Sequence, residues 1–92
     1  FKVQDTSMSG IGIMPDDFVV ARRQRHAQNE DIVVALVGDD ATVRRFRMAS
    51  QLVELCPENP DFRPLRLPRK DVTLLGKVIE VRRYYEGQPS VP

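Results

Sequence analysis

The sequence has very few residues of the types that bind metals or form disulfides. It contains one cysteine, Cys56, and one histidine, His26, among 92 residues. A single cysteine excludes an internal disulfide framework, and a zinc site needs several ligands of these types. We therefore expect no metal and no cofactor. His26 lies in a polar stretch typical of a solvated loop, and we interpret Cys56 as a small strand residue, not a nucleophile.

An excess of charge of one sign is also absent, and so are long apolar runs. The 14 basic and 13 acidic residues give a formal net charge of +1, which creates no bias towards nucleic acid or an anionic membrane. Every apolar run is far shorter than the ~20 residues that cross a bilayer. We expect a soluble, cytoplasmic protein without a membrane segment, in which any DNA-binding part lies elsewhere.

The hydrophobic pattern favours a period of two, with β-branched residues in short runs between turn signals. This pattern predicts an all-β domain. The predicted strands cover residues 1–4, 18–22, 31–37, 42–48, 51–56 and 72–84. Residues 38–41 have the composition of a tight hairpin turn, and residues 48–51 are expected to form the next turn.

Proline and glycine mark two irregular regions. Pro57, Pro60, Pro64 and Pro68 remove backbone donors, so we expect a rigid loop at a sheet edge. Gly76 inside the last predicted strand indicates a bulge or bend. That strand would be an exposed edge that pairs with a second copy of the chain. Its apolar residues Val78, Ile79, Val81 and Tyr84 could instead complete the domain's own core.

Ser7 is the candidate nucleophile. It opens the step Ser7-Met8 before a glycine-rich apolar run that ends at Met14. The small and polar residues around it favour a turn between strands, where a serine can face a cleft. A loop serine is far more often structural than nucleophilic, so this observation alone is weak.

Arg44 is the candidate partner. On an alternating strand it shares a face with Phe46, whereas Arg45 and Arg47 share the opposite face. The first face is the more apolar, so we expect Arg44 to point towards the interior or a cleft, and Arg45 and Arg47 to be solvated. Alternatively, the stem of Arg44 lies along apolar surface and carries its guanidinium to solvent.

Several motifs together resemble the C-terminal domain of LexA-type repressors. They are Ser7-Met8, Gly12-Ile13-Met14, Asn29, Thr42-Val43 with Arg45, Val53-Glu54-Leu55 and Pro57-Glu58-Asn59. The similarity covers nearly the whole chain. It implies a small, mostly antiparallel, partly open barrel or sandwich of short strands over residues 1–85. The remaining residues, 86–92, are expected to form a poorly ordered tail.

In that family a serine cuts the repressor's own linker after an unprotonated lysine has activated it. The resemblance assigns this nucleophile to Ser7 and makes the main-chain amides of Thr6 and Ser7 the oxyanion donors. Arg44 stands at the position of the catalytic lysine, and Asp5 stands where a small glycine is usual. The sequence contains three lysines, Lys2, Lys70 and Lys77, and none occupies the matching position.

Arginine cannot easily replace a lysine that accepts a proton. Desolvation can lower a lysine pKa from about 10.4 towards neutrality, but arginine starts above about 12 and stays protonated in proteins. At about 1.4 kcal/mol per pKa unit, a neutral arginine at pH 7 would cost at least ~7 kcal/mol. We therefore expect Arg44 to orient Ser7 or stabilise an oxyanion, with self-cleavage impaired.

The implied function is the dimerisation and latent self-cleavage domain of a transcriptional repressor of the DNA-damage (SOS) response. Its expected partners are a second copy, the activated RecA filament, and operator DNA through an N-terminal domain. The chain starts at Phe1, so we expect a fragment without that domain and without the cleavage linker. Alternatives are a self-cleaving serine peptidase that is still active, for example at alkaline pH, and a polymerase accessory protein of the UmuD type.

Overall fold

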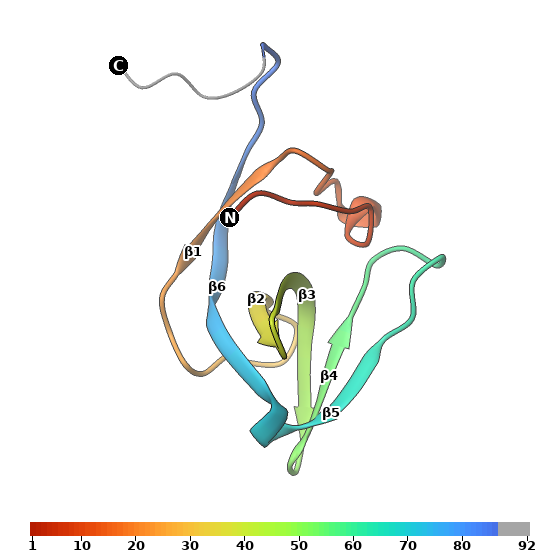
Figure 1. The fold of residues 1–92 in the computed structure, drawn as a ribbon, viewed down its shortest axis with the longest axis vertical. Coiled ribbons are helices and arrows are strands. Elements are labelled where there is room, and N and C mark those ends of the chain that lie inside the picture. Colours follow the sequence, from red (N-terminus) through yellow and green to blue (C-terminus); the bar gives the residue numbers. More distant parts are fainter. Residues whose placement is uncertain (87–92) are drawn as a thin grey trace.

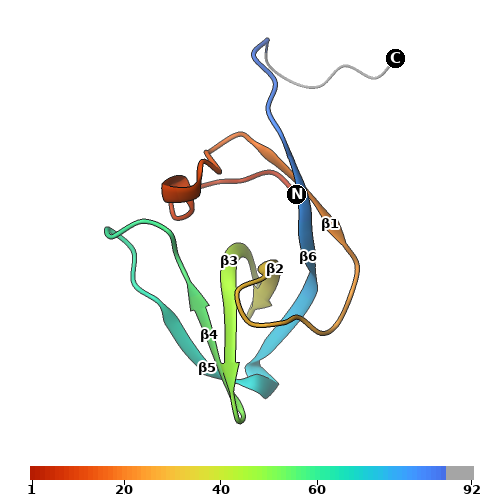
Figure 2. The same cartoon turned by 180° about the vertical axis from the view of Figure 1, so that it is seen from behind.

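The computed structural model describes residues 1–86 and is built around one open, curved antiparallel sheet (Figures 1 and 2). Its strands are β1 (Phe18–Arg22), β2 (Ile32–Val37), β3 (Asp40–Ala49), β4 (Leu52–Cys56), β5 (Leu65–Pro68) and β6 (Val72–Arg82). They lie in the order β1-β6-β2-β3-β4-β5, and all pairs are antiparallel. Two 3-10 turns, Ser9–Ile11 and Arg69–Asp71, complete the elements. The all-β prediction is confirmed.

Both predicted hairpin turns are present. β2 and β3 pair up to Val37 and Asp40, so Gly38 and Asp39 form a two-residue loop, with Gly38 at a φ of 59°. β3 and β4 pair up to Ala49 and Leu52, and Ser50 in the loop between them has a φ of 58°. Turn residues adjacent in sequence fix both connections, which explains why local composition predicted them.

The N-terminal and proline-rich segments differ from the prediction. Residues 1–4 do not form a strand, since they make a single bridge, Lys2 to Phe18, and run alongside β1. The proline-rich loop ends at β5, a strand that the sequence pattern did not predict. β5 is an edge strand, paired with β4 from Leu55↔Leu65 to Leu52↔Pro68, and proline is tolerated at such an edge.

The last strand is an edge along only part of its length, which corrects the expectation of an edge along the whole strand. β6 lies between β1 and β2 and pairs with both (Figure 1). Residues 72–77 pair with β2 and residues 77–82 pair with β1, so one side of residues 78–82 has no strand partner within residues 1–86. Ile79, Val81 and Tyr84 are exposed, whereas Val78 packs partly against the core.

Gly76 marks the predicted irregularity in β6. Val34 pairs with Gly76 and Ala35 with Leu74, so one residue of β6 bulges between these pairs. A Cβ atom at Gly76 would lie 2.5 Å from the carbonyl oxygen of Arg22 in β1. Glycine is therefore required here because the β1 backbone approaches closely.

Both faces of the sheet carry a core cluster. The first consists of Val33, Ala35, Phe46, Val53, Leu55, Val72 and Leu74. The second consists of Val3, Met8, Ile13, Val19, Val34 and Val43. The N-terminal residues of the second cluster hold the segment around Ser7 against the sheet. Within residues 1–86, no helix is long and apolar enough to span a membrane.

The second cluster corrects the prediction that one face of β3 is solvated. Val43 is buried on that face, and the Arg45 side chain is only 22% exposed, whereas Arg47 is 48% exposed. The Arg44 side chain is 12% exposed, so its guanidinium does not extend into solvent. The inward orientation expected for Arg44 is found, but Arg45 is not solvated.

Candidate active site

Ser7 lies at the turn between the N-terminal segment and the 3-10 turn that starts at Ser9, and its side chain is buried. The next residue, Met8, is fully buried in the second core cluster. The Ser9 amide donates to the Thr6 carbonyl at 3.1 Å, which closes the turn around Ser7. The Ser-Met step therefore places a polar side chain beside an apolar anchor, so that packing fixes the serine.

A distant segment holds this turn in place. The Glu58 amide donates to the Ser7 carbonyl at 2.7 Å, and the Gly10 amide donates to the Glu58 carbonyl at 2.7 Å. Asn59 Nδ2 donates to the Thr6 carbonyl at 2.9 Å. A Cβ atom at Gly10 would overlap the Glu58 carbonyl oxygen, so glycine permits this approach. The Pro57-Glu58-Asn59 motif is thus a clamp on the serine turn.

Arg45 completes this support from β3. Its Nε atom pairs with Glu58 Oε1 at 2.5 Å, and its Nη1 donates to the Glu30 carbonyl at 2.8 Å. Glu58 in turn contacts the Ser7 turn through its backbone. Arg45 therefore positions the clamp, and this use explains its burial.

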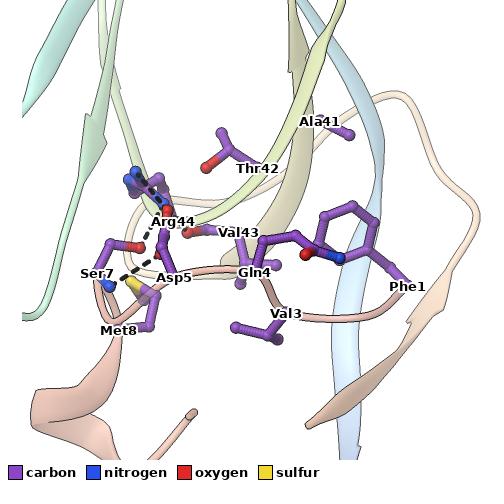
Figure 3. A pocket seen from close by; sticks show the side chains of 10 residues that line it. All are labelled: Phe1, Val3, Gln4, Asp5, Ser7, Met8, Ala41, Thr42, Val43 and Arg44. Carbon is purple, nitrogen blue, oxygen red and sulfur yellow. Dashed lines mark hydrogen bonds and ion pairs between the residues drawn. The ribbon is translucent and has the colours of Figure 1, made fainter. Parts of the chain in front are cut away.

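Arg44 reaches Ser7 directly (Figure 3). Its Nη1 atom donates to Ser7 Oγ at 2.6 Å and to the carbonyl of Val43 at 2.7 Å. The guanidinium carbon lies 6.0 Å from the ring centroid of Phe62, within the range of a cation–π contact. Burial lowers the pKa of Arg44, and the charge of Asp5 opposes this shift only in part. The serine oxygen therefore accepts a hydrogen bond from a partly desolvated cation.

Asp5 is the third polar member of this site. The Ser7 amide donates to Asp5 Oδ1 at 2.9 Å, and Asp5 Oδ2 lies 3.9 Å from Arg44 Nη2. Burial raises the pKa of Asp5, but hydrogen bonds from Ser7 and the Arg44 charge together lower it below the usual range. Asp5 is thus an ionised group at neutral pH, in contact with both residues of the expected pair.

The sequence matches the family described as Peptidase S24-like over residues 1–79. The chain belongs to this family. It is 43% identical over 81 residues to the LexA repressor of Oleidesulfovibrio alaskensis, 45% over 82 residues to that of Desulfitobacterium hafniense, and 51% over 81 residues to that of Alkaliphilus oremlandii. These matches cover 87%, 89% and 88% of this chain and 39%, 39% and 38% of the relatives. They confirm the resemblance to the LexA C-terminal domain.

The chain spans about two fifths of the length of the curated relatives that it matches. The comparisons therefore concern this S24-like portion. For the same reason, the activity and partners of a whole repressor are treated below as proposals.

No lysine of this S24-like chain lines the pocket beside Ser7. The pocket beside Ser7 is lined by residues of the N-terminal segment and of β3, and none of these is a lysine. They are Phe1, Val3, Gln4, Asp5, Ser7, Met8, Ala41, Thr42, Val43 and Arg44. Lys77 pairs with Asp31 at 3.5 Å and, with His26, lines a separate hollow. Lys2 pairs with Asp16 at 3.5 Å.

Cys56 is a buried residue of β4, which agrees with its interpretation as a strand residue. Burial and the neighbouring Glu54 raise the pKa of its thiol, which disfavours the reactive thiolate. Among residues 1–86, no group of three or more His, Cys, Asp or Glu side chains is arranged to hold a metal ion.

Sequence reasoning brought Ser7 and Arg44 together through the resemblance, but it missed the contacts that surround them. Nothing in the local sequence indicates the cation–π contact of Phe62 or the backbone contacts of Glu58, and Asp5 stands out only as a departure from glycine. The one available signal was the unusual charge at Asp5 next to the expected oxyanion donors. The role of the Thr6 amide as a donor remains a prediction.

Proposed function

We propose that this chain is the dimerising, latently self-cleaving part of a LexA-type repressor of the DNA-damage response, in which Arg44 impairs self-cleavage. Membership of the S24-like family and the names of its relatives support the repressor assignment. The observation that carries the impairment is the 2.6 Å hydrogen bond from Arg44 Nη1 to Ser7 Oγ.

In this contact Arg44 donates a hydrogen bond to Ser7, whereas activation of a nucleophile requires a group that accepts its proton. When Ser7 Oγ attacks a peptide carbonyl, a carbon–oxygen bond forms, the carbonyl π electrons move to oxygen, and the serine proton must pass to a base. A guanidinium has donors but no acceptor. Arg44 holds the Ser7 oxygen in place without accepting its proton, so we expect self-cleavage at neutral pH to be slow or absent.

Restoring a titratable base tests this proposal. In the full-length protein with activated RecA, Arg44→Lys should raise the rate of self-cleavage at neutral pH at least ~10²-fold, the lower end of what general-base catalysis contributes. Cleavage is followed by gel electrophoresis, and Ser7→Ala in the Arg44→Lys background is the control that should abolish it. Rapid Ser7-dependent cleavage of the unmodified protein at neutral pH would refute the impairment.

One observation favours a second candidate, an enzyme that works slowly at alkaline pH. Burial lowers the pKa of Arg44, so the fraction of neutral guanidine rises more with pH than it would in water. A cleavage rate that increases steadily up to pH 10 and disappears in Ser7→Ala would support this candidate. A flat, undetectable rate would favour the inactive form.

We also propose that the chain forms a homodimer through the exposed apolar surface of β6, near its edge neighbour β1. Ile79 and Val81 of β6 and Tyr84 just beyond it are exposed, and one side of residues 78–82 has no strand partner within residues 1–86. In a repressor, such a dimer would hold two DNA-binding domains on an operator in the cytoplasm. Sedimentation over a concentration series checks it, since a chain that stays monomeric at tens of micromolar would contradict the dimer.

A polymerase accessory role of the UmuD type is the remaining alternative. The upstream sequence separates the two. An encoded helix-turn-helix would support the repressor, and a short arm without one would support the accessory protein.

A further inference from the structure

The amide of Ser7 already has a hydrogen-bond acceptor. A serine peptidase stabilises the negative oxygen of its tetrahedral intermediate with main-chain amides close to the nucleophile. In this chain the Ser7 amide instead donates to Asp5 Oδ1 at 2.9 Å. A carboxylate oxygen has the charge and acceptor geometry of the oxygen that such an intermediate would place there.

The second carboxylate oxygen faces the other half of the site. Asp5 Oδ2 lies 3.9 Å from Arg44 Nη2, while Arg44 Nη1 holds Ser7 Oγ at 2.6 Å. Figure 3 shows the Asp5 side chain between the Ser7 turn and the Arg44 guanidinium. The Ser7 amide therefore donates to Asp5, and the Arg44 guanidinium, whose charge could also stabilise a developing negative charge, lies near the same carboxylate.

We propose that Asp5 is an internal occupant of the oxyanion position, so that its carboxylate blocks the site independently of the substitution at Arg44. This inference rests on the proposed function, because it treats Ser7 as the nucleophile. It adds a second cause of low activity. Arg44 removes the base, and Asp5 removes an oxyanion donor.

A simpler explanation is that Asp5 only shapes the turn, since aspartate commonly accepts the amide two residues ahead. The turn has other supports, however, because Met8 is fully buried and Glu58 and Asn59 hold the carbonyls of Ser7 and Thr6. The Asp5 side chain is 48% exposed and so contributes little packing. Its approach to Arg44 is also not part of such a turn.

The contact itself is measurable by NMR. In the unmodified chain, the Ser7 amide proton should lie downfield and should shift as Asp5 is protonated below about pH 4. In Asp5→Gly, both effects should be absent. A Ser7 amide that is insensitive to this titration in the unmodified chain would overturn the inference.

A peptide boronic acid that ends in boro-alanine tests the functional consequence without needing a base from the protein. Ser7 Oγ forms a bond to boron, the hydroxyl proton leaves to solvent, and boron becomes a tetrahedral anion whose hydroxyl groups need the oxyanion donors. The unmodified chain should bind this probe weakly. Asp5→Gly should bind it at least ~10-fold more tightly, a conservative figure against the 10²–10³-fold attributed to one oxyanion donor.

Two matched variants identify the cause. Asp16→Gly removes the same charge from a residue that pairs with Lys2 and does not contact Ser7, so it should not change the affinity. Asp5→Asn removes the charge but keeps an acceptor for the Ser7 amide, so it should gain much less than Asp5→Gly. No gain in Asp5→Gly, or an equal gain in Asp5→Asn, would overturn the inference, and thermal melting verifies that each variant is folded.

The role of Ser7 as the nucleophile and the block by Asp5 can be refuted independently of each other. Probe binding that survives Ser7→Ala would refute Ser7 as the nucleophile, while the amide titration still decides whether Asp5 occupies the Ser7 donor. In the Arg44→Lys background, adding Asp5→Gly should raise self-cleavage further. If Arg44→Lys and the double variant with Asp5→Gly cleaved at the same rate, Asp5 would not block the oxyanion position. This would hold even if Arg44→Lys alone restored cleavage.

Discussion

Two arginine–aspartate pairs flank the N-terminal segment, and they differ in what the arginine contacts. Arg83 makes two hydrogen bonds of 2.8 Å to the Asp17 carboxylate and a third of 2.8 Å to the Gly12 carbonyl. Asp17 is 2% exposed and also accepts the Met14 amide at 2.8 Å. Arg44 lies 3.9 Å from Asp5 and makes its short side-chain contact to Ser7.

The difference distinguishes an arginine that is fully used in a structural pair from an arginine that contacts the candidate nucleophile. Arg83 joins the end of β6 to the loop after Ser7, and its donors are used on one buried carboxylate and one carbonyl. The hydrogen bonds to Asp17 raise the pKa of Arg83, whereas burial lowers the pKa of Arg44. A tightly paired cation stabilises the fold, while a desolvated and loosely paired cation can act on a reacting group.

The largest expected effect comes from breaking the tight pair. Arg83→Ala leaves the buried Asp17 carboxylate without its cation and should lower the free energy of unfolding by clearly more than the loss of an exposed ion pair does. Urea denaturation at pH 7 measures this change. Arg82→Ala is the matched control, because Arg82 pairs with the exposed carboxylate of Glu80, so the loss of free energy should be much smaller. If both variants lost the same free energy of unfolding, the Arg83–Asp17 pair would be no stronger than an exposed ion pair. The contrast with the Arg44–Asp5 pair would then fail.

Local sequence features predicted those parts of the fold that depend on neighbouring residues. The predicted strand 18–22 matches β1 residue for residue, and both hairpin turns form where turn residues cluster. Local features do not predict the strand order, because it depends on pairing between residues far apart in sequence. The alternation in β6 could not reveal that β1 would pair with residues 77–82 and β2 with residues 72–77, so an edge was expected along the whole strand.

The candidate site shows the same difference between features that the local sequence predicts and contacts between distant residues that it does not. The resemblance identified Ser7 and Arg44, whose side chains meet in the structure. The contacts of Glu58 with the Ser7 turn lie about fifty residues away along the chain and have no local signature. Asp5 is only two residues from Ser7, but its proximity to Arg44 depends on how the N-terminal segment packs against β3. Residue type alone could not predict that contact.

A smaller effect, the response to acid, sharpens the comparison of the two aspartates. The pKa of Asp17 is lowered mainly by its hydrogen bonds to Arg83, and that of Asp5 is lowered despite the opposing effect of burial. A carboxyl group with a lowered pKa in the folded state stabilises the fold above its unfolded pKa, near 3.9. That stability is lost as the pH falls through the folded pKa.

We therefore expect the urea concentration at the unfolding midpoint to decrease as the pH is lowered from 7 to about 3. Asp17→Asn should reduce this decrease more than Asp5→Asn does. The pKa of Glu30 is also lowered, mainly by Arg47, and that of Glu54 is lowered by a hydrogen bond from Cys56. Both glutamates titrate in every variant and so cancel in the comparison. Asp5 should matter less because its side chain is half-exposed and its cation is 3.9 Å away. If Asp5→Asn flattened the pH dependence as much as Asp17→Asn, then Arg44 would bind Asp5 as firmly as Arg83 binds Asp17. The Ser7 site would in that case be a second structural pair, with its cation no longer free to act on Ser7.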